Sequence, residues 1–81
     1  MTELRWEDRG MRGYCVDSTG KVRGQIFYLF VKEAYDAEVE GAAGVFVRVG
    51  TYVSSDDARR AVERAIEVAA QTKAQENATH E

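Results

Sequence analysis

The sequence predicts an α+β fold: an antiparallel β-meander of four to five strands with one C-terminal α-helix packed on one face. Two observations lead to this prediction. Up to about Val53 the chain is rich in β-branched and aromatic residues separated by glycine-containing turns, whereas from Ser54 onward apolar residues recur at helical spacing. Its 81 residues suffice for one small domain and are too few for two independent cores.

The first predicted element is an edge strand at "LRWE", with Leu4 and Trp6 pointing inward. A hairpin follows in "RGYCVDSTGKVRGQIFYLFV". Its three-residue loop, Ser18 to Gly20, places glycine at the position that needs a left-handed backbone.

This hairpin gives the strand "GQIFYLFVK" two largely apolar faces. The first face starts from the cross-strand pairs Val16–Val22 and Tyr14–Gly24 and continues with Ile26, Tyr28 and Phe30. The second face carries Cys15, Arg23 and Gln25, followed by Phe27, Leu29 and Val31. We expect the helix to cover the first face.

A second hairpin joins "YDAEVE" to "VFVRVGTY" around "GAAG". Apolar and polar side chains separate best onto opposite faces in a register whose apolar face contains the pairs Val39–Val45, Ala37–Val47 and Tyr35–Val49. The opposite face then pairs Asp36 with Arg48 and sets Glu38 beside Phe46. A short helix over residues 31–40 is the alternative, because apolar residues also recur there at helical spacing.

The helix is predicted in "SSDDARRAVERAIEVAAQTKA". Ser54 or Ser55 serves as N-cap, and Asp56 and Asp57 place negative charge in the first turn, where it favours the helix dipole. The inward stripe consists of Ala58, Ala61, Val62, Ala65, Ile66 and Ala69. We expect a single domain over residues 1–74 and a frayed polar tail over residues 75–81.

The second face of the central strand is expected to be buried by another part of the chain or by a partner. Each large apolar side chain left exposed there loses roughly 1.5–3 kcal/mol of stabilisation from burial. Either the N-terminal segment folds across it through Trp6 or Met11, or a second chain docks there, as a symmetric copy or as a different protein. We expect a homodimer or another protein partner. The predicted interface comprises Phe27, Leu29, Val31, Phe46, Arg48 and Tyr52.

Composition and motifs argue against an enzyme. The only histidine, His80, lies in the predicted tail, so neither a histidine-based triad nor a histidine metal site is expected. Cys15 has no histidine to activate it. The sequence therefore predicts no catalytic residue, no cofactor and no metal.

Charge and cysteine content predict a cytoplasmic protein without a membrane segment. The net charge is −3, and a single cysteine excludes an internal disulfide. The N-terminus is too polar for a signal peptide, and the longest apolar run is too short to span a bilayer. Mild acidity also disfavours nucleic-acid binding.

Two alternative functions remain. Aromatic residues on a sheet face, such as Tyr28 and Phe46, are suited to stacking on the bases of single-stranded nucleic acid. Alanines on the inner stripe of the helix leave room for a small ligand between helix and sheet.

The arrangement "W…G…STGKVRGQI…AYDAEV…GTYVSSDDARRAVERAIE" resembles small uncharacterised proteins of phages, prophages and mobile gene cassettes, in which a meander ends in a capped helix. The resemblance extends from about Trp6 to Val68 and rests on turns and helix caps. It implies a protein that occludes or bridges host proteins.

Overall fold

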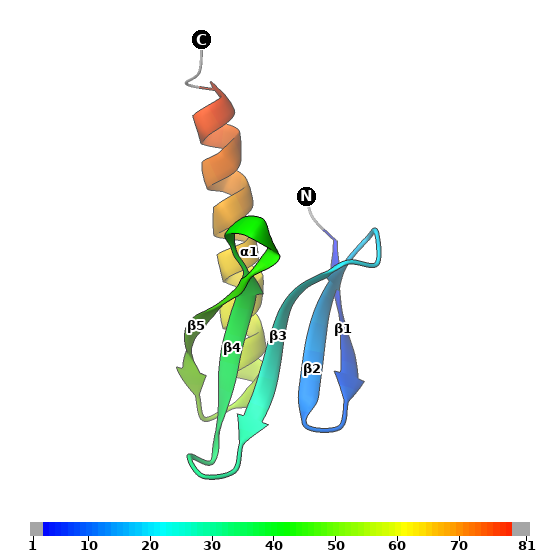
Figure 1. Ribbon diagram of the computed structural model, residues 1–81, viewed down its shortest axis with the longest axis vertical. Coiled ribbons are helices and arrows are strands. Elements are labelled where there is room, and N and C mark those ends of the chain that lie inside the picture. The colour runs from blue at the N-terminus through cyan, green and yellow to red at the C-terminus, as the bar shows by residue number, and fades with distance from the viewer. Residues whose placement is uncertain (1–2, 79–81) are drawn as a thin grey trace.

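The computed structural model describes the backbone of residues 3–78 and the side chains of residues 3–70. It has two layers, an antiparallel five-stranded sheet and one helix across one of its faces (Figure 1). The strands lie side by side in chain order: β1 (Leu4–Arg9), β2 (Arg12–Asp17), β3 (Val22–Leu29), β4 (Ala34–Glu40) and β5 (Phe46–Tyr52). Helix α1 spans Ser55–Ala78, and the predicted α+β meander is confirmed.

The β2–β3 hairpin has the predicted three-residue loop. Gly20 adopts φ +88°, a conformation that L side chains disfavour. An Asp17 carboxylate oxygen accepts hydrogen bonds from the hydroxyl and backbone N–H of Thr19 (2.6 and 2.9 Å) and from the N–H of Lys21 (3.1 Å). The Thr19 hydroxyl bond is the main cause of a lowered Asp17 pKa. The carboxylate therefore holds the loop in its charged form.

The turn between β3 and β4 occupies residues 30–33, and the chain re-enters the sheet at Ala34. Residues 34–40 form a strand, so the alternative of a short helix is wrong. Glu33 takes a left-handed φ of +50° and reverses the chain. Because β3 ends at Leu29, the prediction that Val31 lies on the open sheet face is also wrong; its side chain is 99% exposed in the turn.

The β4–β5 connection is longer than predicted. A 3-10 turn, η1 (Ala42–Gly44), fills it, and the Gly41 N–H donates to the Val45 carbonyl oxygen at 2.7 Å. Val39 therefore pairs with Val47, and the predicted Val39–Val45 pair is wrong.

The helix begins as predicted, at a serine N-cap. The hydroxyl oxygen of Ser54 accepts the backbone N–H groups of Asp56 and Asp57 at 3.1 and 3.4 Å. From there α1 packs against β3, β4 and β5. The predicted tail, residues 75–81, overlaps the end of α1 and then leaves the described residues, so the domain boundary at residue 74 stays a prediction.

The core lies between α1 and the face of the sheet predicted to receive it. It consists of Cys15, Ile26, Ala37, Ala58, Val62 and Ile66. Val62 is fully buried and lies directly over Gly24, where any larger residue would overlap its side chain. Gly24 is thus the position that lets the helix approach the sheet closely.

Two β-bulges change which face some residues occupy. In the first, Cys15 pairs with Gly24 and Val16 pairs with Val22, which leaves one extra residue in β3. In the second, Val49 is the extra residue, in β5. An extra residue inverts the side-chain alternation beyond it. Cys15 therefore joins the helix side, and so does Tyr52, whose predicted place on the open face is wrong.

Candidate protein-interaction surface

The sheet face opposite α1 carries four of the six predicted interface residues, namely Phe27, Leu29, Phe46 and Arg48. None of these three apolar side chains is fully exposed. The Arg12 guanidinium carbon lies 5.5 Å from the ring centroid of Phe27, a cation–π contact. A polar side chain on the same face therefore shields part of the apolar surface of Phe27.

The chain does not fold its N-terminal segment across this face. That segment is β1, which extends the sheet by pairing with β2, so the predicted cover by Trp6 or Met11 is wrong. Trp6 instead packs against the core on the helix side, and Met11 is exposed in the β1–β2 turn.

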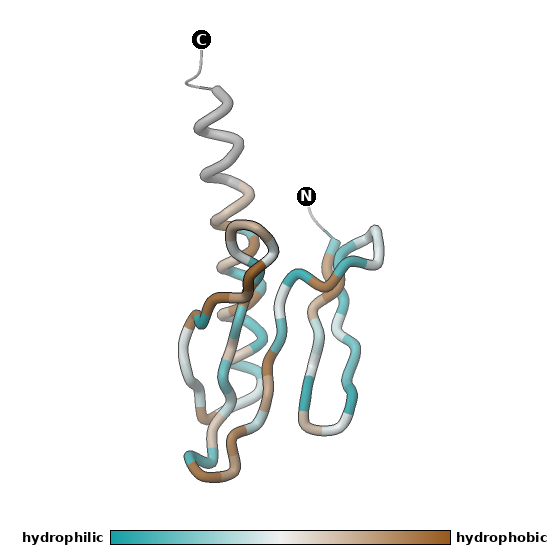
Figure 2. Tube along the Cα trace, viewed as in Figure 1, coloured by the Kyte–Doolittle hydropathy of each residue, from teal (hydrophilic) through white to brown (hydrophobic). Residues whose placement is uncertain are grey.

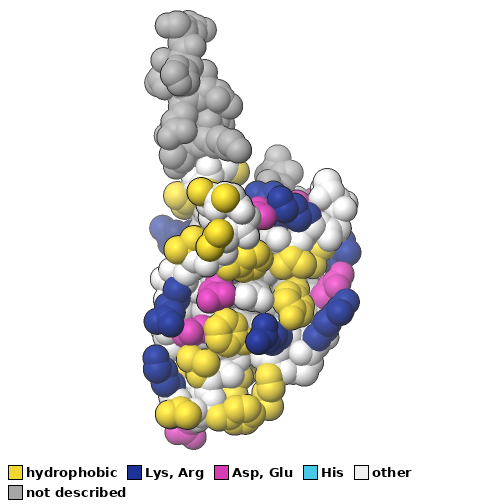
Figure 3. Space-filling view, in the orientation of Figure 1, with side chains coloured by type: hydrophobic (Ala, Val, Ile, Leu, Met, Phe, Trp, Pro, Cys, Tyr) yellow, Lys and Arg dark blue, Asp and Glu magenta, His cyan; other side chains and the backbone are white. Residues whose placement is uncertain are grey.

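Charged side chains alternate with the apolar ones over the open face (Figure 3). Asp36 is 3% exposed; it accepts a hydrogen bond from the Thr51 hydroxyl at 2.6 Å and forms an ion pair with Arg48 at 3.6 Å. Arg48 lies opposite Glu38 and not opposite Asp36, so the predicted cross-strand pair Asp36–Arg48 is wrong. Near the β2–β3 loop, Glu40 pairs with Lys21 at 3.2 Å and with Arg23 at 3.7 Å. This pairing makes the face a mixed polar surface rather than a continuous apolar one.

The outer edge at β5 is more apolar than the opposite edge at β1 (Figure 2). Val45, just before the strand, is 64% exposed, Val47 is 54% exposed, and Val49 is also exposed. Arg48 is the only charged residue of β5. The sequence signal for this edge is "VFVRVGTYV", in which β-branched residues surround a single charge.

The opposite edge, β1, is charged. Arg5 pairs with Glu7 at 3.0 Å, and Asp8 pairs with Arg59 of α1 at 2.6 Å. Charges on an edge strand discourage pairing with another chain, so its charges protect β1, whereas β5 has only Arg48 and the bulge at Val49.

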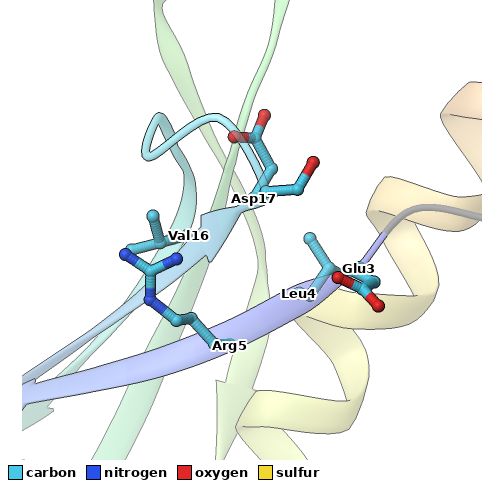
Figure 4. A pocket seen from close by; sticks show the side chains of 6 residues that line it. Glu3, Leu4, Arg5, Val16 and Asp17 are labelled. Carbon is cyan, nitrogen blue, oxygen red and sulfur yellow. The ribbon is translucent and has the colours of Figure 1, made fainter.

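Two shallow clefts flank β1. One, of about 310 Å³, is lined by Glu3, Leu4, Arg5, Val16, Asp17 and Ser18 (Figure 4). The other, of about 290 Å³, lies beside the start of α1 and includes Tyr28, Tyr35 and Arg59. Both volumes lie near the lower limit of roughly 300 Å³ for small-molecule sites.

Cys15 is the only cysteine, and it is fully buried beneath the helix. Burial is the main cause that raises the pKa of its thiol from 9.0 to about 11, and the negative charges of Glu63 and Asp17 add to the shift. A neutral buried thiol is a poor nucleophile, so Cys15 serves as a core residue.

The raised pKa predicts a specific loss of stability at alkaline pH. The folded pKa lies above that of an unfolded cysteine, about 8.5, so the contribution is complete below that pH and is lost as the pH rises toward 11. Chemical denaturation from pH 7 to pH 11 should show the free energy of unfolding of wild type falling about 2–3 kcal/mol further than that of Cys15→Ala. Parallel curves for the two proteins would contradict the prediction.

Within the described residues, no group of three or more histidine, cysteine, aspartate or glutamate side chains is placed to hold a metal ion. The same part of the chain contains no helix with the length and hydrophobicity needed to cross a membrane.

Comparisons with protein-family models, with curated proteins and with solved structures gave no match to this chain.

Proposed function

We propose that the protein is a non-enzymatic protein-interaction module that works as a homodimer, joined through the β5 edge of its sheet. The observation that carries the proposal is a run of exposed valines at the β5 edge: Val45 just before the strand, and Val47 and Val49 within it. An edge strand also presents unpaired backbone N–H and C=O groups, which form a template for another strand.

The contrast between the two edges supports pairing at β5. The β1 edge is lined with paired charges, whereas β5 carries Arg48 alone among valine, phenylalanine and tyrosine. A symmetric dimer buries the same residues twice, at about 25 cal/mol per Å² of apolar surface.

The open face has a different role in this proposal. Joining two β5 strands makes one continuous sheet, in which Phe46 and Arg48 of both copies lie at the centre of the open face. The resemblance to phage and mobile-cassette proteins supports a further partner there, a host protein that the dimer occludes. The ion pairs around the face argue against nucleic acid, because Arg23 already pairs with both Asp17 and Glu40 and is poorly available to phosphates.

Light scattering coupled to size exclusion tests the dimer. Wild type is expected at twice the chain mass of 9.1 kDa. Val47→Lys should shift the protein to the monomer, because it places a charge in the apolar edge contact. Val45→Lys, just outside the strand, provides a second variant in case the first disturbs folding.

Leu29→Asp is the matched control, since it introduces a charge on the open face of β3, away from the edge. It is expected to leave the dimer intact while circular dichroism shows a folded protein. A monomeric wild type at all concentrations would refute the homodimer. If Leu29→Asp is monomeric and Val47→Lys is dimeric, the dimer contact lies on the open face and not at the β5 edge.

A further inference from the structure

We infer that the two β5 strands pair antiparallel about a two-fold axis at Val47, so that Phe46 of each copy lies opposite Arg48 of the other. The inference rests on the proposed homodimer and adds its register and its specific contacts.

The backbone of β5 limits the possible registers. The Val45 carbonyl oxygen accepts the Gly41 N–H at 2.7 Å, so the polar backbone groups of Val45 point toward β4. Because these groups alternate in direction along a strand, those of Val47, which pairs with Val39, also point inward. The backbone groups of Phe46 and Arg48 therefore point outward, toward a second strand.

A second copy must align these outward groups with its own. Three symmetric registers do so, with the axis at Phe46, at Val47 or at Arg48. An axis at Arg48 sets two guanidinium groups directly opposite each other, which is unfavourable. An axis at Phe46 sets Arg48 opposite Gly44, which is not extended but left-handed, at φ +76°. Only the axis at Val47 avoids both problems.

In this register the side chains are complementary on the open face. Phe46 and Arg48 share that face, and each guanidinium meets the aromatic ring of the other copy. The Arg48 side chain is 61% exposed and its ion pair with Asp36 is long, at 3.6 Å, so the group is available for a second contact. Two cation–π pairs form in each dimer.

On the helix side, Val47 meets its own copy and Val45 meets Val49. Helix α1 then adds apolar surface beside the axis. Arg59 and Glu63 of α1 contact Trp6 on β1, so the opposite flank of the helix faces the β5 edge. Helical spacing places Ala61, Ala65 and the exposed Val68 on that flank.

Disulfide formation tests the register. An axis at Val47 places its two copies in a non-hydrogen-bonded pair, about 4.5 Å apart between Cα atoms, and thus near enough for a disulfide. Val47→Cys should cross-link to a covalent dimer under mild oxidation. Val45→Cys or Val49→Cys alone should not, whereas their equimolar mixture should. Native Cys15 is buried and gives little background.

A second measurement tests the contacts. Arg48→Ala removes both cation–π pairs and should weaken dimer formation about tenfold in sedimentation equilibrium, and Arg48→Lys should restore part of the affinity. A wild-type dimer whose Val47→Cys variant does not cross-link would overturn the register and leave the homodimer standing. A monomeric wild type would refute both the register and the homodimer.

Discussion

Replacing Gly24 with alanine is expected to cost about 3 kcal/mol or more of folding free energy, a large part of the roughly 5–15 kcal/mol that stabilises a small domain. A Cβ at this position would overlap Cγ1 of Val62 and lie 3.0 Å from the carbonyl oxygen of Glu38. Val62 is fully buried, so its side chain cannot turn out into solvent to relieve the overlap. Either the helix shifts from the sheet or the chain fails to fold, and urea denaturation followed by circular dichroism measures the loss.

A double-mutant cycle identifies the cause. Val62→Ala alone should cost roughly 2 kcal/mol, and adding Gly24→Ala to it should cost far less than in wild type, because the overlapping methyl group is gone. Gly10→Ala is the matched control: nothing lies within 4 Å of its Cβ position, so only its φ of +62° opposes the change, by about 1 kcal/mol. Equal losses for Gly24→Ala and Gly10→Ala would refute the close-contact explanation.

Trp6→Ala is expected to destabilise the domain by about 3 kcal/mol. Trp6 is the cross-strand partner of Cys15 and joins β1 to the helix, which otherwise packs against β3, β4 and β5. Its indole N–H donates to the Glu63 carboxylate at 2.7 Å, and the Arg59 guanidinium carbon lies 5.2 Å from its ring centroid. Removing the ring breaks both contacts and admits water toward Cys15.

Trp6→Phe is the control for this prediction. It keeps an aromatic ring beneath Arg59 and loses the N–H donor, so it should cost about 1 kcal/mol, the value of one hydrogen bond. Circular dichroism must follow unfolding, because Trp6 is the only tryptophan. Equal losses for the two variants would show that the hydrogen bond to Glu63, not the buried ring, provides the stabilisation.

The positions of the predicted interface residues show which features of the sheet could be predicted from the sequence. Phe27, Leu29, Phe46 and Arg48 lie on the open face because strand alternation is a local property. Tyr52 lies on the helix side because of the bulge at Val49. Gly50, inside the strand, was the sequence signal for a bulge, and strand alternation alone misses it. The predicted meander places the last strand at an edge, but the exposure of Val45, Val47 and Val49 there is known only from the folded chain.

By itself, the sequence determined the elements of this protein: the Ser18–Gly20 loop, a serine cap at Ser54 or Ser55, the helical stripe and the strand order of a meander. These follow from short-range chemistry, namely glycine conformation, side-chain capping and hydrophobic spacing. Only the tertiary structure decided the two bulges, the burial of Cys15 and the exposure of the valines at the β5 edge. Each depends on how residues distant in the chain fit together, as Val62 fits over Gly24, and no local pattern contains that information.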